Sequence, residues 1–215
     1  GRVITTSGEH EINIAATKPA AAWVEEGGAL TFGDATFSQI LLDAHKLHVA
    51  IKVTEELLYD NAFGLENYII DQFGKALANA EEDAFLNGTG VGQPLGLFAK
   101  TGGGTTAETL TAALKADDIL NLIYALKRPY RKNASFIIND KNLAVIRKLK
   151  DNNGAYMWQP SYQAGEPDKI LGYDVHTSAY APEDAIAFGD YSYYNIGDRG
   201  TRSFKQLTEL FAGNG

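Results

Sequence analysis

The feature that most constrains the fold is a helical period between Leu65 and Leu86. Apolar residues recur there at intervals of one to four and fall on one side of a 3.6-residue helix: Leu65, Tyr68, Ile69, Phe73, Leu77, Ala80 and Ala84. At about 1.5 Å per residue, the helix would be roughly 33 Å long. Asp60 or Asn61 is expected to cap its start, and Asn87-Gly88 to end it. A helix of this length predicts an elongated body.

The residues before this helix predict a long β-hairpin. Residues 1–19 are polar and small, with one weak strand pattern at Ile12 and Ile14. From Trp23 to Val53, glycines separate two extended segments, and the second alternates apolar and polar residues at Leu47, Val49, Ile51 and Val53. This alternation predicts a strand with one solvated face. We expect residues 27–43 to be mobile in an isolated subunit, because the glycine-bearing turn has few apolar residues.

The residues after the long helix predict an α+β unit. A connection is expected at 101–111, where three glycines precede threonines. Asp117-Asp118 should open a helix carrying Leu120, Ile123 and Leu126, which Pro129 stops. A second helix should begin at Asn139 or Asp140 and carry Leu143, Ile146 and Leu149. Strands are expected at 135–138, 173–177, 185–188 and 191–196. Interspersed helices and strands are typical of α+β folds.

Composition excludes several classes of protein. The net charge of −8 argues against a dedicated nucleic-acid-binding domain. The densest basic groups, at 127–132 and 147–150, are interpreted as solvated helix ends. The absence of cysteine excludes disulfides and thiolate metal sites. No apolar stretch approaches the roughly 18 residues of a membrane-spanning helix, so no membrane partner is expected.

Candidate catalytic and binding motifs are weak. The glycine-rich run 88–96 matches neither common phosphate-loop pattern and follows a helix, so we interpret it as a helix stop and a tight loop. His45 and His48 would lie on opposite faces of a strand, which disfavours a metal pair. No nucleophile elbow surrounds any serine. The acidic groups at 25–26, 55–56 and 81–83 are read as solvated faces instead of paired catalytic carboxylates. We therefore expect no enzyme activity, cofactor or metal.

Four short phrases occur in an informative order: Glu55-Glu56-Leu57-Leu58, Asn87-Gly88-Thr89-Gly90-Val91-Gly92-Gln93-Pro94-Leu95-Gly96, Tyr156-Met157-Trp158-Gln159-Pro160 and Phe188-Gly189-Asp190-Tyr191. Together they make the chain resemble the major capsid proteins of tailed phages and prophages with the HK97-type fold. The resemblance runs from about Trp23 to about Arg199.

The resemblance implies an HK97-type α+β fold with several parts. Residues 1–22 would be part of an N-terminal arm and 23–54 the extended hairpin loop. Residues 55–111 would be a peripheral domain with the long helix as its spine, and 112–200 the axial domain. Residues 201–215 would return toward the peripheral domain.

The implied function is structural. Such a protein would self-assemble as hexamers and pentamers into an icosahedral head that encloses phage DNA without sequence-specific binding. A scaffolding segment or protein, a maturation protease and a portal are further expected partners. The location would be the virion, and the bacterial cytoplasm during assembly. The alternatives are an encapsulin-type compartment and a ligand-binding α+β domain.

The residues expected at assembly interfaces are Trp23, Glu25, Glu26, Phe37, Lys46 and Trp158. Trp23 suits a subunit contact and internal packing equally, whereas core packing competes with an interface role for Trp158. Some relatives join a lysine of the extended loop to an asparagine of a neighbour. Residues 23–39 contain no lysine, and Asn214 carries no motif, so we predict no such cross-link.

The ends of the chain also raise an expectation. The sequence starts at Gly1, contains one methionine, Met157, and stops at Gly215. We expect a piece of a longer protein. Residues 1–215 alone are expected to give monomers or small oligomers, because assembly closes several modest interfaces together.

Overall fold

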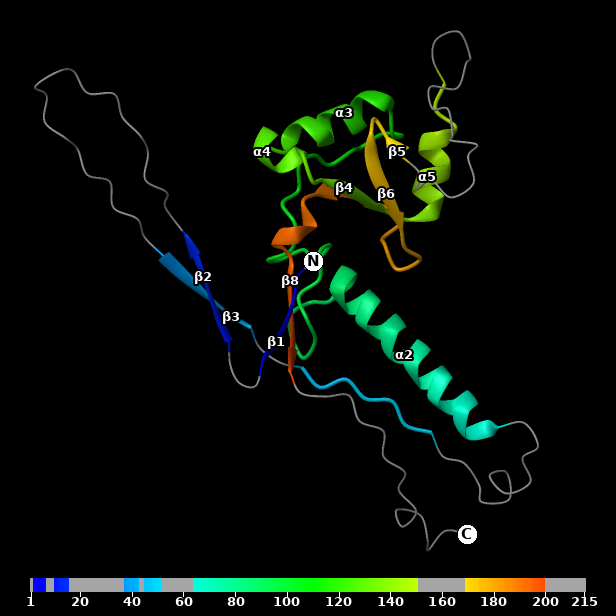
Figure 1. The fold of residues 1–215 in the computed structure, drawn as a ribbon. Coiled ribbons are helices and arrows are strands. Elements are labelled where there is room, and N and C mark those ends of the chain that lie inside the picture. Colours follow the sequence, from blue (N-terminus) through cyan, green and yellow to red (C-terminus); the bar gives the residue numbers. More distant parts are fainter. Residues whose placement is uncertain are drawn as a thin grey trace, which may run out of the picture. The chain divides into compact units, whose positions relative to one another are not determined.

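A computed structural model describes residues 2–6, 10–15, 37–42, 45–51, 64–150 and 169–199 (Figure 1). The chain divides into two compact units. The first contains residues 1–44 and 194–215, and the second contains residues 45–193.

The described part of the first unit contains two pairs of strands. β1 (Arg2–Thr6) pairs in parallel with β8 (Asn195–Arg199), with Arg2 opposite Asn195. β2 (His10–Ala15) pairs antiparallel with β3 (Phe37–Leu42), with Ile12 opposite Ile40. The strand predicted at 191–196 is partly wrong, because a 3-10 helix, η1 (Tyr191–Tyr193), precedes β8. Sequence patterning missed β1 altogether.

The position of the hairpin differs from the prediction. Its paired strands are β2 and β3, so the hairpin begins at His10 and not near Trp23. The weak pattern at Ile12 and Ile14 is therefore a real strand. Residues 45–51, predicted as a strand, form none. Alternation predicts which face of a strand would be buried, but a strand forms only where a neighbouring strand completes its hydrogen bonds.

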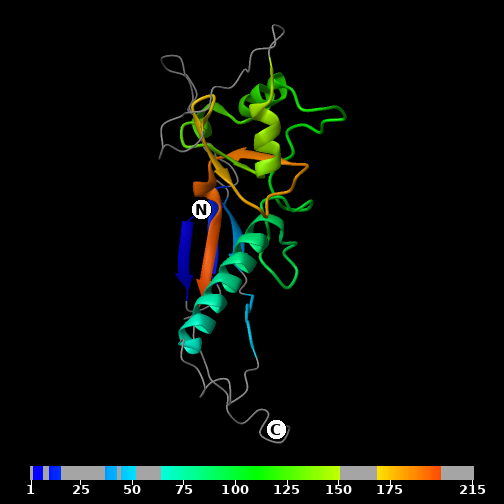
Figure 2. The same cartoon turned by 90° about the vertical axis from the view of Figure 1, so that its right-hand side faces the viewer.

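The second unit contains the long helix α2 (Leu65–Asn87), which confirms the predicted helix (Figure 2). Its N-cap is Gly64, at φ +68°, so a cap at Asp60 or Asn61 was wrong. Within the helix, Leu86 alone is buried. A half-buried stripe contains Leu65, Ile69, Phe73, Leu77 and Ala84. The predicted apolar side therefore exists, although Tyr68 and Ala80 are exposed.

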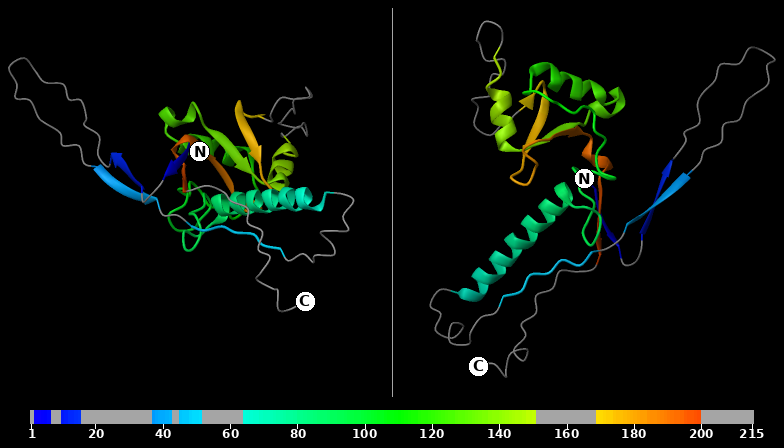
Figure 3. Two further views of the ribbon diagram at one scale, coloured as in Figure 1. Left: turned by 60° about the horizontal axis from the view of Figure 1, so that its bottom comes forward. Right: turned by 180° about the vertical axis from the view of Figure 1, so that it is seen from behind.

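A four-stranded sheet forms the centre of the second unit, in the order β5-β6-β4-β7 (Figure 3). The strands are β5 (Lys169–Ile170), β6 (Tyr173–Thr177), β4 (Ser135–Ile138) and β7 (Ile186–Gly189). β4 is parallel to β6 and antiparallel to β7. Three of these strands were predicted within one residue, which confirms the α+β class. The two-residue β5 was missed.

The core lies between this sheet and two helices. Phe136 and Ile138 of β4 are fully buried. They pack with buried residues of α3 (Ala116–Ala125) and α5 (Asp140–Arg147): Ile119, Ile123, Leu143 and Ile146. Phe136, Tyr173 and Phe188 form an aromatic cluster, with centroids 4.6 Å apart for Phe136–Phe188 and 4.9 Å for Tyr173–Phe188. The Tyr173–Phe188 pair is edge-on, an arrangement that stabilises beyond the area the rings bury.

The end of α3 differs from the prediction. The helix stops at Ala125, and Leu126 is extended. A short helix, α4 (Arg128–Arg131), follows with Pro129 in its first turn, where a missing N–H costs nothing. Pro129 therefore starts a helix instead of stopping one. Leu120, one of the apolar residues expected in this helix, is 39% exposed.

The start of α5 confirms a predicted cap. The buried Asn139 side chain accepts a hydrogen bond from the Lys141 N–H at 3.0 Å. Its amide nitrogen donates to the Ala181 carbonyl at 2.9 Å. One side chain therefore both caps the helix and holds the connection between β6 and β7.

Candidate assembly surfaces

The C-terminal end of α2 is joined to the β6–β7 connection by side chains. Asn87 Nδ2 donates to the Tyr180 carbonyl at 2.7 Å and to Asp83 Oδ1 at 2.8 Å. Ser178 Oγ lies 2.6 Å from Glu82 Oε1, to which it donates. Three hydrogen bonds therefore fix the last turn of the helix and position its carboxylates beside residues 178–184.

The glycine-rich run after α2 is a tight loop. A Cβ at Gly88 would lie 2.1 Å from the Pro94 carbonyl oxygen, and one at Gly96 would lie 2.5 Å from the Gly88 nitrogen. The N–H groups of Gly88, Gly90 and Gly96 donate to Ala84, Pro94 and Gly88. Because these amides are used within the chain, the loop does not offer them to a phosphate. The helix-stop interpretation is confirmed.

A surface rich in cations and aromatic rings surrounds α4. We call it the cationic surface and define it by Tyr124, Lys127, Arg128, Arg131, Lys132 and Tyr193. The Arg131 guanidinium lies 4.7 Å from the centroid of the Tyr124 ring, and its Nε donates to the Leu126 carbonyl at 2.6 Å. Tyr130 meets Tyr193 edge-on at 5.5 Å. Tyr124 and Tyr193 are 67% and 68% exposed.

A second surface is acidic. We call it the acidic surface and define it by Glu82, Asp83, Glu183 and Asp184. Asn87 joins the two segments of this surface, because its side chain donates hydrogen bonds both to Asp83 of α2 and to the Tyr180 carbonyl of the β6–β7 connection. Glu183 forms an exposed ion pair with Lys141 at 2.5 Å. In Figures 1 and 2 the β6–β7 connection lies beside the end of α2, away from α4.

Exposed apolar side chains also occur around the start of the second unit. Leu47 and Ile51 are 47% and 60% exposed, and Tyr68 and Ile70 of α2 are 61% and 45% exposed.

The described residues offer little for catalysis. They contain no group of three His, Cys, Asp or Glu able to hold a metal. The Tyr191 hydroxyl is buried, and burial raises its pKa. The nearby Ile137 backbone lowers this pKa, by less than burial raises it. The Tyr191 hydroxyl nevertheless makes no hydrogen bond of normal geometry within the described part of the chain. Among the helices of that part, none is long and apolar enough to cross a membrane.

The structure places two of the predicted interface residues. Lys46 is exposed in segment 45–51, and Phe37 begins β3 opposite Ala15. Trp23, Glu25, Glu26 and Trp158 lie outside the described residues. Sequence reasoning missed Tyr124 and Tyr193. The available signal was Tyr124, which lies three residues before the basic run at 127–132, but the sequence analysis attributed that run to solvated helix ends.

Comparisons with known proteins all find capsid proteins of phages or GTA particles. The sequence matches the family described as the phage capsid family over residues 1–214. It is 29% identical over 126 residues to the major capsid protein of Enterobacteria phage HK97. That alignment covers 58% of this chain and 32% of the phage protein, so the chain spans about a third of that relative.

Solved structures show the same fold. The capsid of a native GTA particle, computed with C5 symmetry, matches with a TM-score of 0.76 and 31% identity, covering 88% of this chain and 71% of that chain. A structure from Mycobacterium phage Bobi matches with a TM-score of 0.60 and 19% identity, covering 83% and 62% of the two chains. At that identity the second match shows the fold alone.

These observations define a protein with the HK97-type fold that the phage and GTA capsid structures share. The chain belongs to the phage capsid family. The phage and GTA capsids among its relatives do not favour the encapsulin alternative.

Proposed function

We propose that this protein is the major capsid protein of a phage or GTA-type particle and assembles with copies of itself into a closed icosahedral shell around DNA. The observation that carries the proposal is the match to the GTA capsid, which combines 31% identity with a TM-score of 0.76 over 88% of the chain. Common fold and common sequence over that length support a common role.

The physical properties of the second unit support a role in association. Large side chains remain exposed at several places, among them Tyr68 of α2, Tyr124 of α3 and Tyr193 of η1. Aromatic residues are enriched at protein interfaces, where they bury much area at low entropic cost. A subunit that works by contact with its copies needs such groups on its outside.

The particle would be built from pentamers and hexamers, and its place would be the virion, with assembly in the bacterial cytoplasm. A scaffolding segment or protein, a maturation protease and a portal would be its further partners. The protein would have no catalytic role. Its acidic charge of −8 suits a wall that encloses DNA without adhering to it.

We assign the parts of the chain as expected from the resemblance. Residues 1–22 form part of an arm, whose strand β2 pairs with β3 of the extended loop at 23–54. Residues 55–111 form the peripheral domain, 112–200 the axial domain and 201–215 a return toward the peripheral domain. Trp23, Glu25, Glu26, Phe37, Lys46 and Trp158 are proposed to contact neighbouring subunits.

Light scattering on the purified full-length protein tests this function. We expect particles of one large size, whose scattering falls when salt or denaturant separates them. A thermal-shift screen with small molecules run alongside tests the ligand-binding alternative, because a ligand that binds only the folded state raises its unfolding temperature. A monomer that a small molecule reproducibly stabilises would contradict the shell.

A further inference from the structure

We infer that the cationic surface around α4 binds the acidic surface of a neighbouring copy, so that adjacent subunits join head to tail. This inference rests on the proposed shell function. To that function it adds the identity of the two surfaces through which neighbouring copies meet.

The cationic surface concentrates like charge without neutralising it. Four of the 19 Lys and Arg residues fall within 127–132. Lys127, Arg128 and Lys132 are exposed, and Arg131 is half-buried. Among the described residues, none of these four side chains forms an ion pair with a carboxylate. Uncompensated like charges repel one another in an isolated subunit, and an approaching acidic surface relieves that repulsion.

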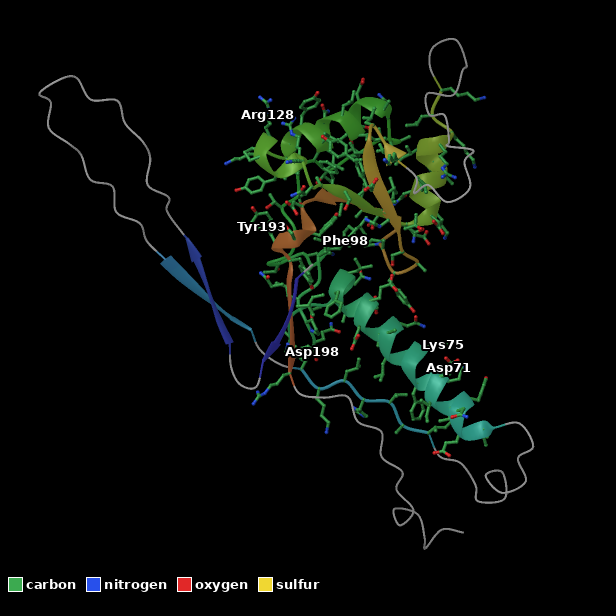
Figure 4. The ribbon with its side chains drawn as sticks, viewed as in Figure 1. Asp71, Lys75, Phe98, Arg128, Tyr193 and Asp198 are labelled. Carbon is green, nitrogen blue, oxygen red and sulfur yellow. The ribbon has the colours of Figure 1, made fainter. Side chains whose placement is uncertain are left out.

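Aromatic groups make the same surface suited to a protein partner. Arg131 is held in place by the Tyr124 ring and the Leu126 carbonyl, so little side-chain entropy remains to be lost. Figure 4 labels Arg128 and Tyr193, which lie on α4 and η1. Tyr and Arg are the residues most enriched where protein interfaces gain their binding energy. These rigid aromatic anchors distinguish the surface from a solvated helix end.

The acidic surface has the complementary charge. Four carboxylates lie at the end of α2 and in the β6–β7 connection, which Ser178 and Asn87 join, and Lys141 pairs with one of them, Glu183. The hydrogen bonds of Asn87 and Ser178 fix two of them in position. The whole chain carries −8, so a copy of the same chain is an abundant acidic partner.

The two surfaces lie in different places on one unit. A contact between different surfaces of identical chains is heterologous, and it closes a ring when the rotation between neighbours divides a full turn. Rings of this kind are the capsomers that the proposed function requires. A two-fold contact would instead need each surface to match itself, and a cationic surface repels its own copy.

Two charge-reversal variants of the full-length protein test the inference. The first carries Lys127→Glu and Arg128→Glu, and the second carries Glu183→Lys and Asp184→Lys. Each variant alone should associate about tenfold more weakly than the unaltered protein in sedimentation velocity. Mixing the two should restore association, because each reversed surface then meets a complementary one. The restored association should weaken with added salt.

A matched control carries Lys100→Glu and Lys148→Glu, which change the net charge equally at exposed positions elsewhere. It should associate like the unaltered protein. Normal association of the first variant, or no rescue in the mixture, overturns the inference alone. If the unaltered protein and the control do not associate, the proposed function fails and the inference with it. Loss of duplex DNA binding by the first variant, with unchanged self-association, would identify a nucleic-acid surface and overturn the inference as well.

Discussion

Asn87, at the last position of α2, donates a hydrogen bond of 2.7 Å to the carbonyl of Tyr180, 93 residues further along the chain. The same amide donates to Asp83 at 2.8 Å. Together with the hydrogen bond from Ser178 to Glu82, this side chain ties α2 to the β6–β7 connection. These contacts hold the C-terminal end of α2, the part of the helix that contains its one buried residue, Leu86.

Replacing Asn87 with Ala should destabilise the protein by about 1 kcal/mol, since both hydrogen bonds are exposed and water replaces them in part. Urea unfolding measures the change. Asn79→Ala is the matched control, because Asn79 is an exposed residue of the same helix. The control should be neutral or slightly stabilising, since alanine favours helices. Equal effects of the two substitutions would show that Asn87 does not hold the connection.

Replacing Asn139 with Ala should cost about 2 kcal/mol, because a helix cap and a buried hydrogen bond to Ala181 are lost together. Asn139→Ser should recover part of this loss, since serine also caps helices. The exposed Asn121 of α3 provides the control, Asn121→Ala. Thermal unfolding of the three variants compares them, and a serine variant no better than alanine would argue against the cap.

Replacing Phe136 with Ala should cost about 3 to 5 kcal/mol, because its ring is fully buried against Tyr173 and Phe188. Leu120→Ala serves as the comparison, since Leu120 is 39% exposed and should cost much less. Denaturant unfolding gives both values. A small loss at Phe136 would mean that the aromatic cluster is not the centre of the core.

Alkaline pH should destabilise the protein through Tyr191. Burial raises the pKa of this phenol above its ordinary 10.0. The unfolded chain then loses the proton first, so the folded state holds more protons and stability falls as pH rises above about 10. Tyr191→Phe should flatten this fall between pH 10 and 12 while leaving stability at pH 7 little changed. An unaltered slope in the phenylalanine variant would assign the alkaline loss to other groups.

Much of the second unit could be predicted from sequence because its signals are local. The period of α2, the cap at Asn139 and the apolar run of β4 each follow from neighbouring residues. Pro129 misled the prediction because proline both ends helices and starts them, and only the extended Leu126 distinguishes the two cases.

The pairing of distant strands was beyond local patterns. β1 finds its partner at β8, and residues 45–51 have a strand pattern without strand pairing. The acidic surface could not be predicted from sequence for the same reason. Glu82 and Glu183 are 101 residues apart, and the hydrogen bonds of Ser178 and Asn87 bring their segments together.

The central claim is that this chain is the subunit of a closed shell. Electron microscopy of the purified full-length protein tests it most directly. Our account predicts closed particles of uniform size, in which a reconstruction shows the α2 spine and the β5-β6-β4-β7 sheet repeated around five-fold and six-fold positions. Monomers or irregular aggregates at every concentration and salt, from protein that is folded by circular dichroism, would contradict it.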